Sequence, residues 1–256
     1  MPAAPKPADH FSGHAGNYAK YRPGYPDALF AWLAQLAPAA DTAWDCGCGN
    51  GQATTALAAH FLKVLGTDLS AEQVTRAPAH PRVEYRAAPA DRSGLPDGSC
   101  DLVTVAQALH WFDFDDFYAE AGRVLKPGGI LAAWTYTLLR TDPEITALVE
   151  RFHAQVVGPW WPPERRWVDQ GYRDIPFPYR DIQVPRFEIR LRWTRDELLA
   201  YVGTWSASER YRKEKGEDPT NALRGPLAAL WPDPAVPKTI VWPIAVRAGR
   251  KPRSER

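Results

Sequence analysis

Short apolar runs alternate with amphipathic stretches between residues 26 and 136. Short apolar runs bounded by turn residues are typical of strands buried in a parallel sheet. Stretches with an apolar residue at every third or fourth position are typical of the helices that cover such a sheet. The alternation of the two patterns predicts an open α/β sheet. The first predicted strand ends at Asp45, and the next four cover 61–67, 83–87, 101–106 and 130–136. The predicted helices cover 26–37, 52–60, 71–77 and 114–125.

The stretch 140–182 departs from this alternation and is rich in aromatic residues, prolines and arginines. Long irregular insertions often act as lids or binding loops, so we expect a cap over a binding site. An aromatic mini-core that braces the sheet is the alternative interpretation. The aromatic residues concerned are Trp160, Trp161, Trp167, Tyr172, Phe177 and Tyr179.

The C-terminal part returns to regular patterns. Residues 183–193 alternate between apolar and polar positions as a strand does, and Thr194 offers an N-cap for a helix over 195–205. Residues 239–247 form the last predicted strand. Pro243 cannot donate a hydrogen bond within it, so we expect a bulge or a late start at this point.

Charge and composition exclude several classes of protein. The 256 residues include 31 basic and 30 acidic side chains, so no overall positive field indicates a nucleic-acid or membrane partner. The chain shows no apolar run of membrane-spanning length and no signal-peptide core, so we expect a cytoplasmic protein. Cys46 and Cys48 are closely spaced, but no second Cys or His pair has ligand spacing. We therefore predict no disulfide framework and no metal site.

The candidate chemistry begins in the turn after Asp45. Glycines at positions 47, 49 and 51 lie between a predicted strand and a predicted helix, whose N-terminus attracts anionic groups. The dinucleotide fingerprint requires glycine, one residue, glycine, two residues, glycine, and neither possible register fits it. The observed pattern is an acid followed by three glycines, each separated by one residue. This spacing argues against a nicotinamide oxidoreductase.

The acid and the glycines resemble the first motif of the class I S-adenosylmethionine-dependent methyltransferases. Further stretches match that family in order and spacing: the Ala-acid pair and Leu-Pro over 90–96, and RVLKPGG over 123–129. The resemblance covers 43–137 well and 11–36 more loosely. QALHWFD and the N-terminal FSGHAGNYAKYRPGYP are similar to the type 11 and trans-aconitate methyltransferase-like subgroup.

The resemblance implies a Rossmann-like open sheet of about seven strands, mostly parallel with an antiparallel last strand, and helices on both faces. It also implies S-adenosyl-L-methionine as the cofactor. We expect 1–256 to form a single domain. Its expected parts are a lid and helix at 11–40, a cofactor-binding core at 41–137, the cap at 138–182, strands and a helix completing the sheet at 183–248, and a tail at 249–256.

Several residues are candidates for holding this cofactor. The Asp68 carboxylate, at the tip of the second strand, suits two ribose hydroxyls; a helix-cap role is weaker because Ser70 already offers a cap. Asp91 could contact the adenine amino group or be an ordinary loop acid. Tyr18 and Arg22 could bind the methionine carboxylate from a lid, or be surface residues. The full predicted cofactor set is Tyr18, Arg22, Asp45, Gly47, Cys48, Gly49, Gly51, Asp68, Leu69, Ala90, Asp91 and Gln107.

The end of the fourth strand should lie beside the methyl donor. His110 could act there as a general base, or only shape the pocket. His110, Trp111 and Trp205 form the predicted substrate-binding set. Enzymes that methylate amino groups of bases commonly carry an Asn/Asp-Pro-Pro-aromatic motif at this point. Its absence disfavours DNA or RNA as the acceptor.

The sequence therefore predicts a methyltransferase that acts on a small molecule as a monomer or homodimer. The subgroup resemblance suggests a carboxylate acceptor, which arginines of the cap could clamp. A cofactor-binding protein without turnover and a macromolecular methyltransferase are the alternatives. The arginines are Arg165, Arg166, Arg173 and Arg180, which solvation at the surface would explain equally well.

Overall fold

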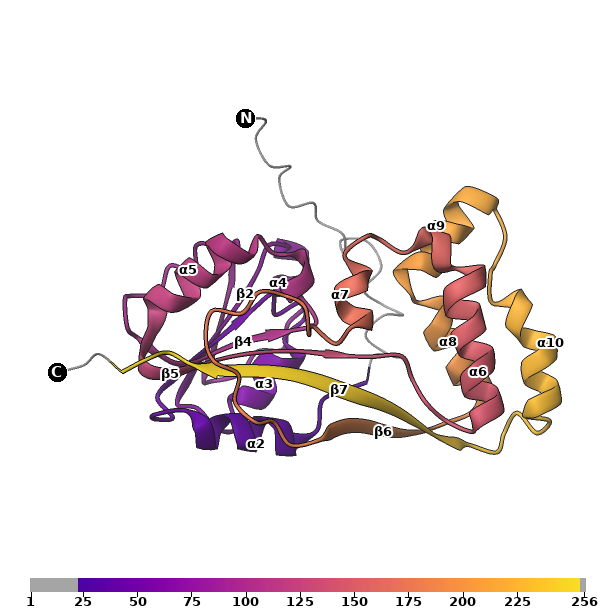
Figure 1. The fold of residues 1–256 in the computed structure, drawn as a ribbon, viewed down its shortest axis with the longest axis horizontal. Helices are drawn as coiled ribbons and strands as arrows, with labels where there is room; N and C mark the ends of the chain where they lie inside the picture. Colours follow the sequence, from indigo (N-terminus) through magenta and orange to yellow (C-terminus); the bar gives the residue numbers. More distant parts are fainter. Residues whose placement is uncertain (1–22, 254–256) are drawn as a thin grey trace.

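A computed structural model describes residues 23–253, so the predicted lid residues Tyr18 and Arg22 lie outside the described part. The described residues contain one seven-stranded sheet, with the order β3-β2-β1-β4-β5-β7-β6 (Figure 1). The strands are β1 Thr42–Cys46, β2 Lys63–Asp68, β3 Val83–Ala87, β4 Cys100–Ala106, β5 Leu125–Tyr136, β6 Phe187–Trp193 and β7 Lys238–Arg250.

Strand directions match the predicted architecture. Strands β1 to β5 pair in parallel, and β7 runs antiparallel to both β5 and β6. The chain enters the sheet at β1, moves outward to β3, and then crosses back to β4 on the other side of β1. This reversal creates a switch point between β1 and β4, where ligands bind in open α/β sheets.

Helices cover both faces of the sheet because alternate strand residues point in opposite directions. Leu102 of β4 joins a core with α2 (Asp27–Leu36) and α3 (Gln52–Leu57), whereas Val103 joins a second core with α5 (Phe114–Val124). Figure 1 shows α2 and α3 below the sheet and α5 above it. The short helix α4 (Ala71–Thr75) lies against β2 and β3.

The second half of the chain adds a helical lobe beyond β6 and β7 (Figure 1). The insertion predicted to be irregular contains helices, and Phe152 and Trp161 pack on Trp205 with ring centroids 5.9 and 5.7 Å apart. These aromatic rings belong to the same continuous core as α2, α3 and Leu102 of β4. The helices of the lobe are α6 Pro143–Arg151, α8 Arg195–Gly203, α9 Ser206–Lys215 and α10 Asn221–Leu230. The short helix α7 Arg165–Asp169 lies instead over the sheet, where Trp167 packs on Phe114 of α5.

Of two local predictions, one is confirmed and one is wrong. The KPGG segment lies within the bounds of β5, but the ladder with β4 passes from Leu125 directly to Ile130 and Gly128 has a φ of 81°, so the predicted turn interrupts the pairing before Ile130. Pro243 causes neither a bulge nor a late start, because β7 begins at Lys238 and pairs with β6 in one register. Pro243 lies where the ladder between β5 and β7 ends, and its carbonyl still accepts from the N–H of Thr137 at 3.0 Å. Its missing donor therefore costs the sheet only one terminal hydrogen bond.

Candidate functional site

The turn after β1 has left-handed backbone at all three glycines, with φ of 69°, 52° and 84° at Gly47, Gly49 and Gly51. A Cβ at Gly51 would lie 2.3 Å from the Tyr85 hydroxyl oxygen, so packing excludes larger residues there. A Cβ at Gly49 would meet no atom within 4 Å, so this glycine faces open space. Glycine adopts this backbone without strain and leaves room for a ligand to approach the main chain.

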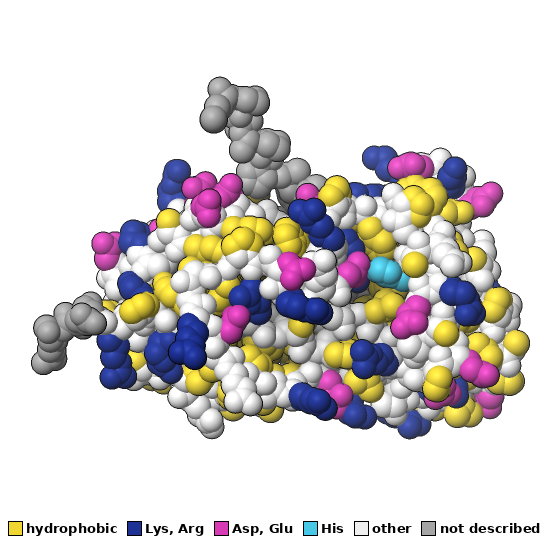
Figure 2. Space-filling view, viewed as in Figure 1, with side chains coloured by type: hydrophobic (Ala, Val, Ile, Leu, Met, Phe, Trp, Pro, Cys, Tyr) yellow, Lys and Arg dark blue, Asp and Glu magenta, His cyan; other side chains and the backbone are white. Residues whose placement is uncertain are grey.

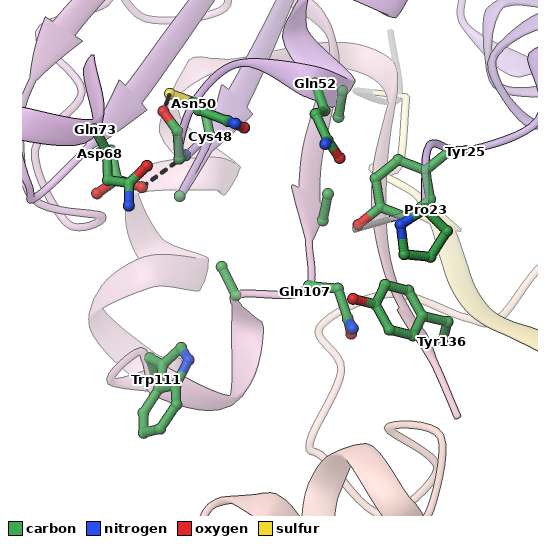
Figure 3. A pocket seen from close by; sticks show the side chains of 15 residues that line it. Pro23, Tyr25, Cys48, Asn50, Gln52, Asp68, Gln73, Gln107, Trp111 and Tyr136 are labelled. Carbon is green, nitrogen blue, oxygen red and sulfur yellow. Dashed lines mark hydrogen bonds between the residues drawn. The ribbon is translucent and has the colours of Figure 1, made fainter. Parts of the chain in front are cut away.

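A pocket lies over this turn, at the carboxyl ends of β1, β2, β4 and β5 (Figure 3). Its empty volume, which includes space open to solvent, is about 770 Å³. Its position is the switch point of the sheet. The lining residues are Pro23, Tyr25, Gly47, Cys48, Gly49, Asn50, Gln52, Ala53, Asp68, Gln73, Ala106, Gln107, Ala108, Trp111 and Tyr136.

Asp68 enters the pocket from the end of β2. One carboxylate oxygen accepts a hydrogen bond from the N–H of Gly49 at 2.8 Å, drawn dashed in Figure 3, and the other accepts from the N–H of Ser70 at 2.9 Å. Ser70 itself caps α4 by accepting from the N–H of Gln73. Asp68 thus joins the glycine turn to the opposite wall of the pocket.

Asp45, by contrast, does not line the pocket. Its side chain is fully buried beneath the turn and accepts hydrogen bonds from the hydroxyls of Thr54 at 2.6 Å and Thr104 at 2.8 Å. Burial raises the pKa of this carboxyl to about 6, although the two hydroxyls oppose the shift. The structure therefore gives Asp45 a supporting position behind the turn.

Gln107 follows β4 and lines the pocket with a backbone φ of 56°. Its N–H donates to the carbonyl of Trp134 at 2.9 Å, and its side-chain oxygen accepts from the hydroxyl of Thr135. In Figure 3 this side chain lies beside Tyr136. A non-glycine residue in the left-handed region is strained, and such strain persists only where surrounding contacts hold it.

His110 and Trp111 lie in the 3₁₀ turn Leu109–Trp111. Trp111 lines the pocket, whereas His110 is outside the lining set. The Nδ1 atom of His110 is 2.7 Å from the hydroxyl oxygen of Tyr172, a residue of the cap. Nothing in the sequence indicated that Tyr172 is the partner of His110, because 62 residues separate the two positions.

Other predicted residues lie away from the pocket. Leu69 is exposed, Asp91 is exposed on the loop after β3, and Trp205 is buried among the aromatic rings of the helical lobe. The loop that carries Ala90 and Asp91 is fastened to α5, because buried Glu120 accepts from both the N–H and the hydroxyl of Ser93. The predicted site residues that the structure describes and that do not line the pocket are Asp45, Gly51, Leu69, Ala90, Asp91, His110 and Trp205.

Sequence reasoning missed several lining residues. Tyr136 ends β5, so the rule that ligands lie at carboxyl ends of strands could have identified it. Asn50, Gln52 and Gln73 follow the turn or occupy the helix after the neighbouring strand, where nothing in their spacing distinguishes them from solvated residues. Tyr25 comes from a segment far from the strands in sequence and reaches the site only through the fold.

All three cysteines are buried and reduced. Burial raises the pKa of the thiols of Cys46 and Cys48 well above the usual value and that of Cys100 to about 11. Across residues 23–253, no cluster of His, Cys, Asp or Glu has the composition of a metal site. The helices within the same residues are too short or too polar to cross a membrane.

The strand order, the glycine turn and Asp68 at the end of β2 together define a nucleotide-binding type of site in a Rossmann-like fold. Comparison with known proteins identifies the class. Residues 44–133 match the family model described as methyltransferase domain. A methyltransferase of Dictyostelium discoideum is 33% identical over 222 residues, which cover 85% of this chain and 84% of that protein. A Mycobacterium tuberculosis methyltransferase is 40% identical over 123 residues, 47% of this chain and 49% of that protein.

The solved structures agree. A structure described as a type II methyltransferase from Anaeromyxobacter dehalogenans is 47% identical, with a TM-score of 0.86 over 91% of this chain and 99% of that one. The chain belongs to the class I S-adenosylmethionine-dependent methyltransferase family. It is thus a methyltransferase whose cofactor is S-adenosylmethionine.

Proposed function

We propose that this methyltransferase acts on a small-molecule acceptor bound beside Gln107, Trp111 and Tyr136. The observation that carries the proposal is one continuous pocket, which reaches from Asp68 and the glycine turn to these side chains. The surface gives further support. Figure 2 shows Lys and Arg interspersed with Asp and Glu on the visible face, and the net charge is +1, so no single-sign field favours a nucleic-acid acceptor.

The residues present fit the cofactor. The space over Gly49 gives an extended ligand access to the main chain, and the two oxygens of Asp68 suit a ribose diol. In our proposal Gly47, Cys48 and Gly49 hold the amino-acid half, and Asp68 holds the ribose. S-adenosylmethionine supplies an activated methyl group on a sulfonium. Trp111, Tyr25 and Tyr136 offer aromatic faces, which attract such a cation.

The protein's contribution is then mainly positional. Methyl displacement requires the acceptor atom in line with the breaking bond and water kept out. The pocket wall built from Pro23, Tyr25 and Tyr136 would exclude water, and Gln107 would orient the acceptor or the donor by hydrogen bonding. His110 is the candidate base for an acceptor that must lose a proton.

A carboxylate group as the methyl acceptor has weaker support than a small-molecule acceptor in general. Arg165 pairs with Asp169 at 2.8 Å and stacks 4.3 Å from the Trp161 ring, and Arg166 stacks on Trp167. These contacts already engage two of the predicted clamp residues, and Arg173 and Arg180 are exposed. We therefore propose a small molecule without assigning the anion to the cap arginines, and the trans-aconitate-like subgroup stays a prediction.

The test is release of S-adenosylhomocysteine. The protein is incubated with methyl-labelled S-adenosylmethionine and fractionated metabolite extract, and the label is followed into small molecules, protein and RNA. We expect label in the small-molecule fraction. The Asp68→Ala variant, which should bind the cofactor more weakly, serves as the control and should transfer less label. Label in protein or RNA would favour a macromolecular acceptor. Cofactor binding by calorimetry without release from any extract would favour a binding protein without turnover.

A further inference from the structure

Among residues 23–253, Gln107 and Tyr172 are the non-glycine residues with positive φ, 56° and 62°. They are 65 positions apart in the chain but belong to one neighbourhood. A strained backbone conformation is kept only when surrounding contacts impose it. The two strained residues therefore call for a common explanation.

Tyr172 is held from several sides. Its side chain is fully buried, and its N–H donates to the carbonyl of Trp167 at 2.8 Å. The Arg247 guanidinium on β7 donates to the carbonyl of Tyr172 at 3.3 Å and also to that of Ile175. Gly171, with a φ of 61°, is packed so closely that a Cβ would lie 2.8 Å from Ala245. The cap is thereby fixed to the last strand at the point where Tyr172 enters the core.

The Tyr172 hydroxyl meets groups from two elements of the pocket wall. It lies 2.7 Å from Nδ1 of His110. The Thr135 side chain and the backbone N–H groups of Leu109 and His110 also face this hydroxyl. Thr135 in turn donates to the side-chain oxygen of Gln107. Burial raises the pKa of Tyr172, so the hydroxyl keeps its proton. The short contact between the hydroxyl and Nδ1 requires one of the two atoms to donate to the other, so it favours a single tautomer of the imidazole.

We propose that Tyr172 is a positioning residue for methyl transfer: it holds the imidazole of His110 in one tautomer and orientation and, through Thr135, fixes the amide of Gln107 at the pocket wall. The effect on catalysis rests on the proposed function, whereas the effect on the His110 tautomer does not.

The test compares Tyr172→Phe with Tyr118→Phe. Both changes remove one tyrosine hydroxyl that fastens the cap; the Tyr118 hydroxyl donates to the carbonyl of Pro176 at 2.6 Å, away from the pocket. Long-range ¹H–¹⁵N spectra at pH 8.5 report the imidazole tautomers, with His110→Gln used only to assign the signals. Calorimetry with S-adenosylhomocysteine, thermal unfolding and methyl transfer to extract complete the set.

We expect wild type and Tyr118→Phe to show one and the same tautomer of His110, and Tyr172→Phe to show a mixture of the two tautomers. Methyl transfer should fall about 3- to 10-fold in Tyr172→Phe alone, as for loss of one buried hydrogen bond, while S-adenosylhomocysteine affinity stays within about threefold. Unchanged His110 signals in Tyr172→Phe would overturn the proposal, as would a mixture of tautomers in wild type. If wild type releases no S-adenosylhomocysteine, the proposed function fails, but the spectra still decide the role of Tyr172.

Discussion

Replacement of Asp45 by Asn should stabilise the protein at neutral pH. Asp45 is fully buried at the end of β1, with the hydroxyls of Thr54 and Thr104 as partners. Ionising a carboxyl there removes it from water without a cation beside it, and burial raises its pKa to about 6. Asparagine has a similar shape but no charge, and threonine hydroxyls can accept from its amide as well as donate.

The direction of the pH dependence of stability follows from the pKa values of Asp45 in the unfolded and folded states. The carboxyl titrates near 3.8 in the unfolded chain and near 6 in the folded protein, so the folded state binds more protons between these values. Stability contributed by the protonated group is therefore complete below pH 3.8 and is lost as the pH rises through 6. The difference between 3.8 and about 6 corresponds to about 3 kcal/mol, an order-of-magnitude figure.

The assay is urea unfolding of wild type and Asp45→Asn from pH 4 to pH 8. The pKa of Glu120 is lowered to about 2, because hydrogen bonds from Arg123 and Ser93 outweigh burial, and it titrates in both proteins. Such shared groups cancel in the difference between the two curves. We expect the stability of Asp45→Asn relative to wild type to rise by roughly 2–3 kcal/mol across this range.

A flat difference curve would show that the Asp45 carboxyl ionises as easily in the folded protein as in the unfolded chain, and the reasoning would fail. Cofactor affinity provides a second check. Because Asp45 does not line the pocket, S-adenosylhomocysteine should bind Asp45→Asn within about threefold of wild type. A loss beyond tenfold would mean that Asp45 is part of the cofactor site, as the sequence motif predicted.

Three other substitutions test the site and the lobe. Asp68→Ala should weaken S-adenosylhomocysteine binding by about 1–3 kcal/mol in calorimetry through lost charge-assisted hydrogen bonds; unchanged affinity would contradict the ribose role. Gly49→Ala should abolish binding and lower stability by about 1–2 kcal/mol, since alanine is strained at a φ of 52°. The same strain would be greater for valine at this position. If Gly49→Ala still binds S-adenosylhomocysteine, the ligand does not approach Gly49. Thr194→Ala breaks the capping box with Glu197 and should cost about 1 kcal/mol in urea unfolding with binding intact.

The positions of the strands and helices were largely predictable because burial imposes periodicity on the sequence. Strand β3 was placed at its observed bounds, and the capping role of Thr194 is confirmed by its reciprocal bonds with Glu197. The turn at KPGG was recognised from its residues, and the ladder between β4 and β5 is interrupted there. Pro243 was misjudged, because its local chemistry predicted an interruption whereas the pairing with β6 continues through it in one register.

Residues at strand ends were also predictable, because the topology sends the ligand there. Gly49, Asp68, Gln107 and Trp111 were named from sequence and line the pocket. Trp205 was named from the resemblance to the methyltransferase subgroup and is buried instead in the core, against Phe152 and Trp161. Aromatic residues serve packing and recognition equally well, so composition could not separate the two uses.

The last strand has a part in the site that its position in the sequence conceals. Gln107 is strained and is held through Thr135 on β5, while Tyr172 is strained and is held through Arg247 on β7. Strands β5 and β7 are neighbours, so both strained residues are secured by one antiparallel pair that forms between distant parts of the chain. A non-glycine residue enters the left-handed region only when such contacts are already made. The geometry of the pocket wall therefore depends on completion of the sheet by β7, more than 100 residues after the glycine turn that binds the cofactor in our proposal.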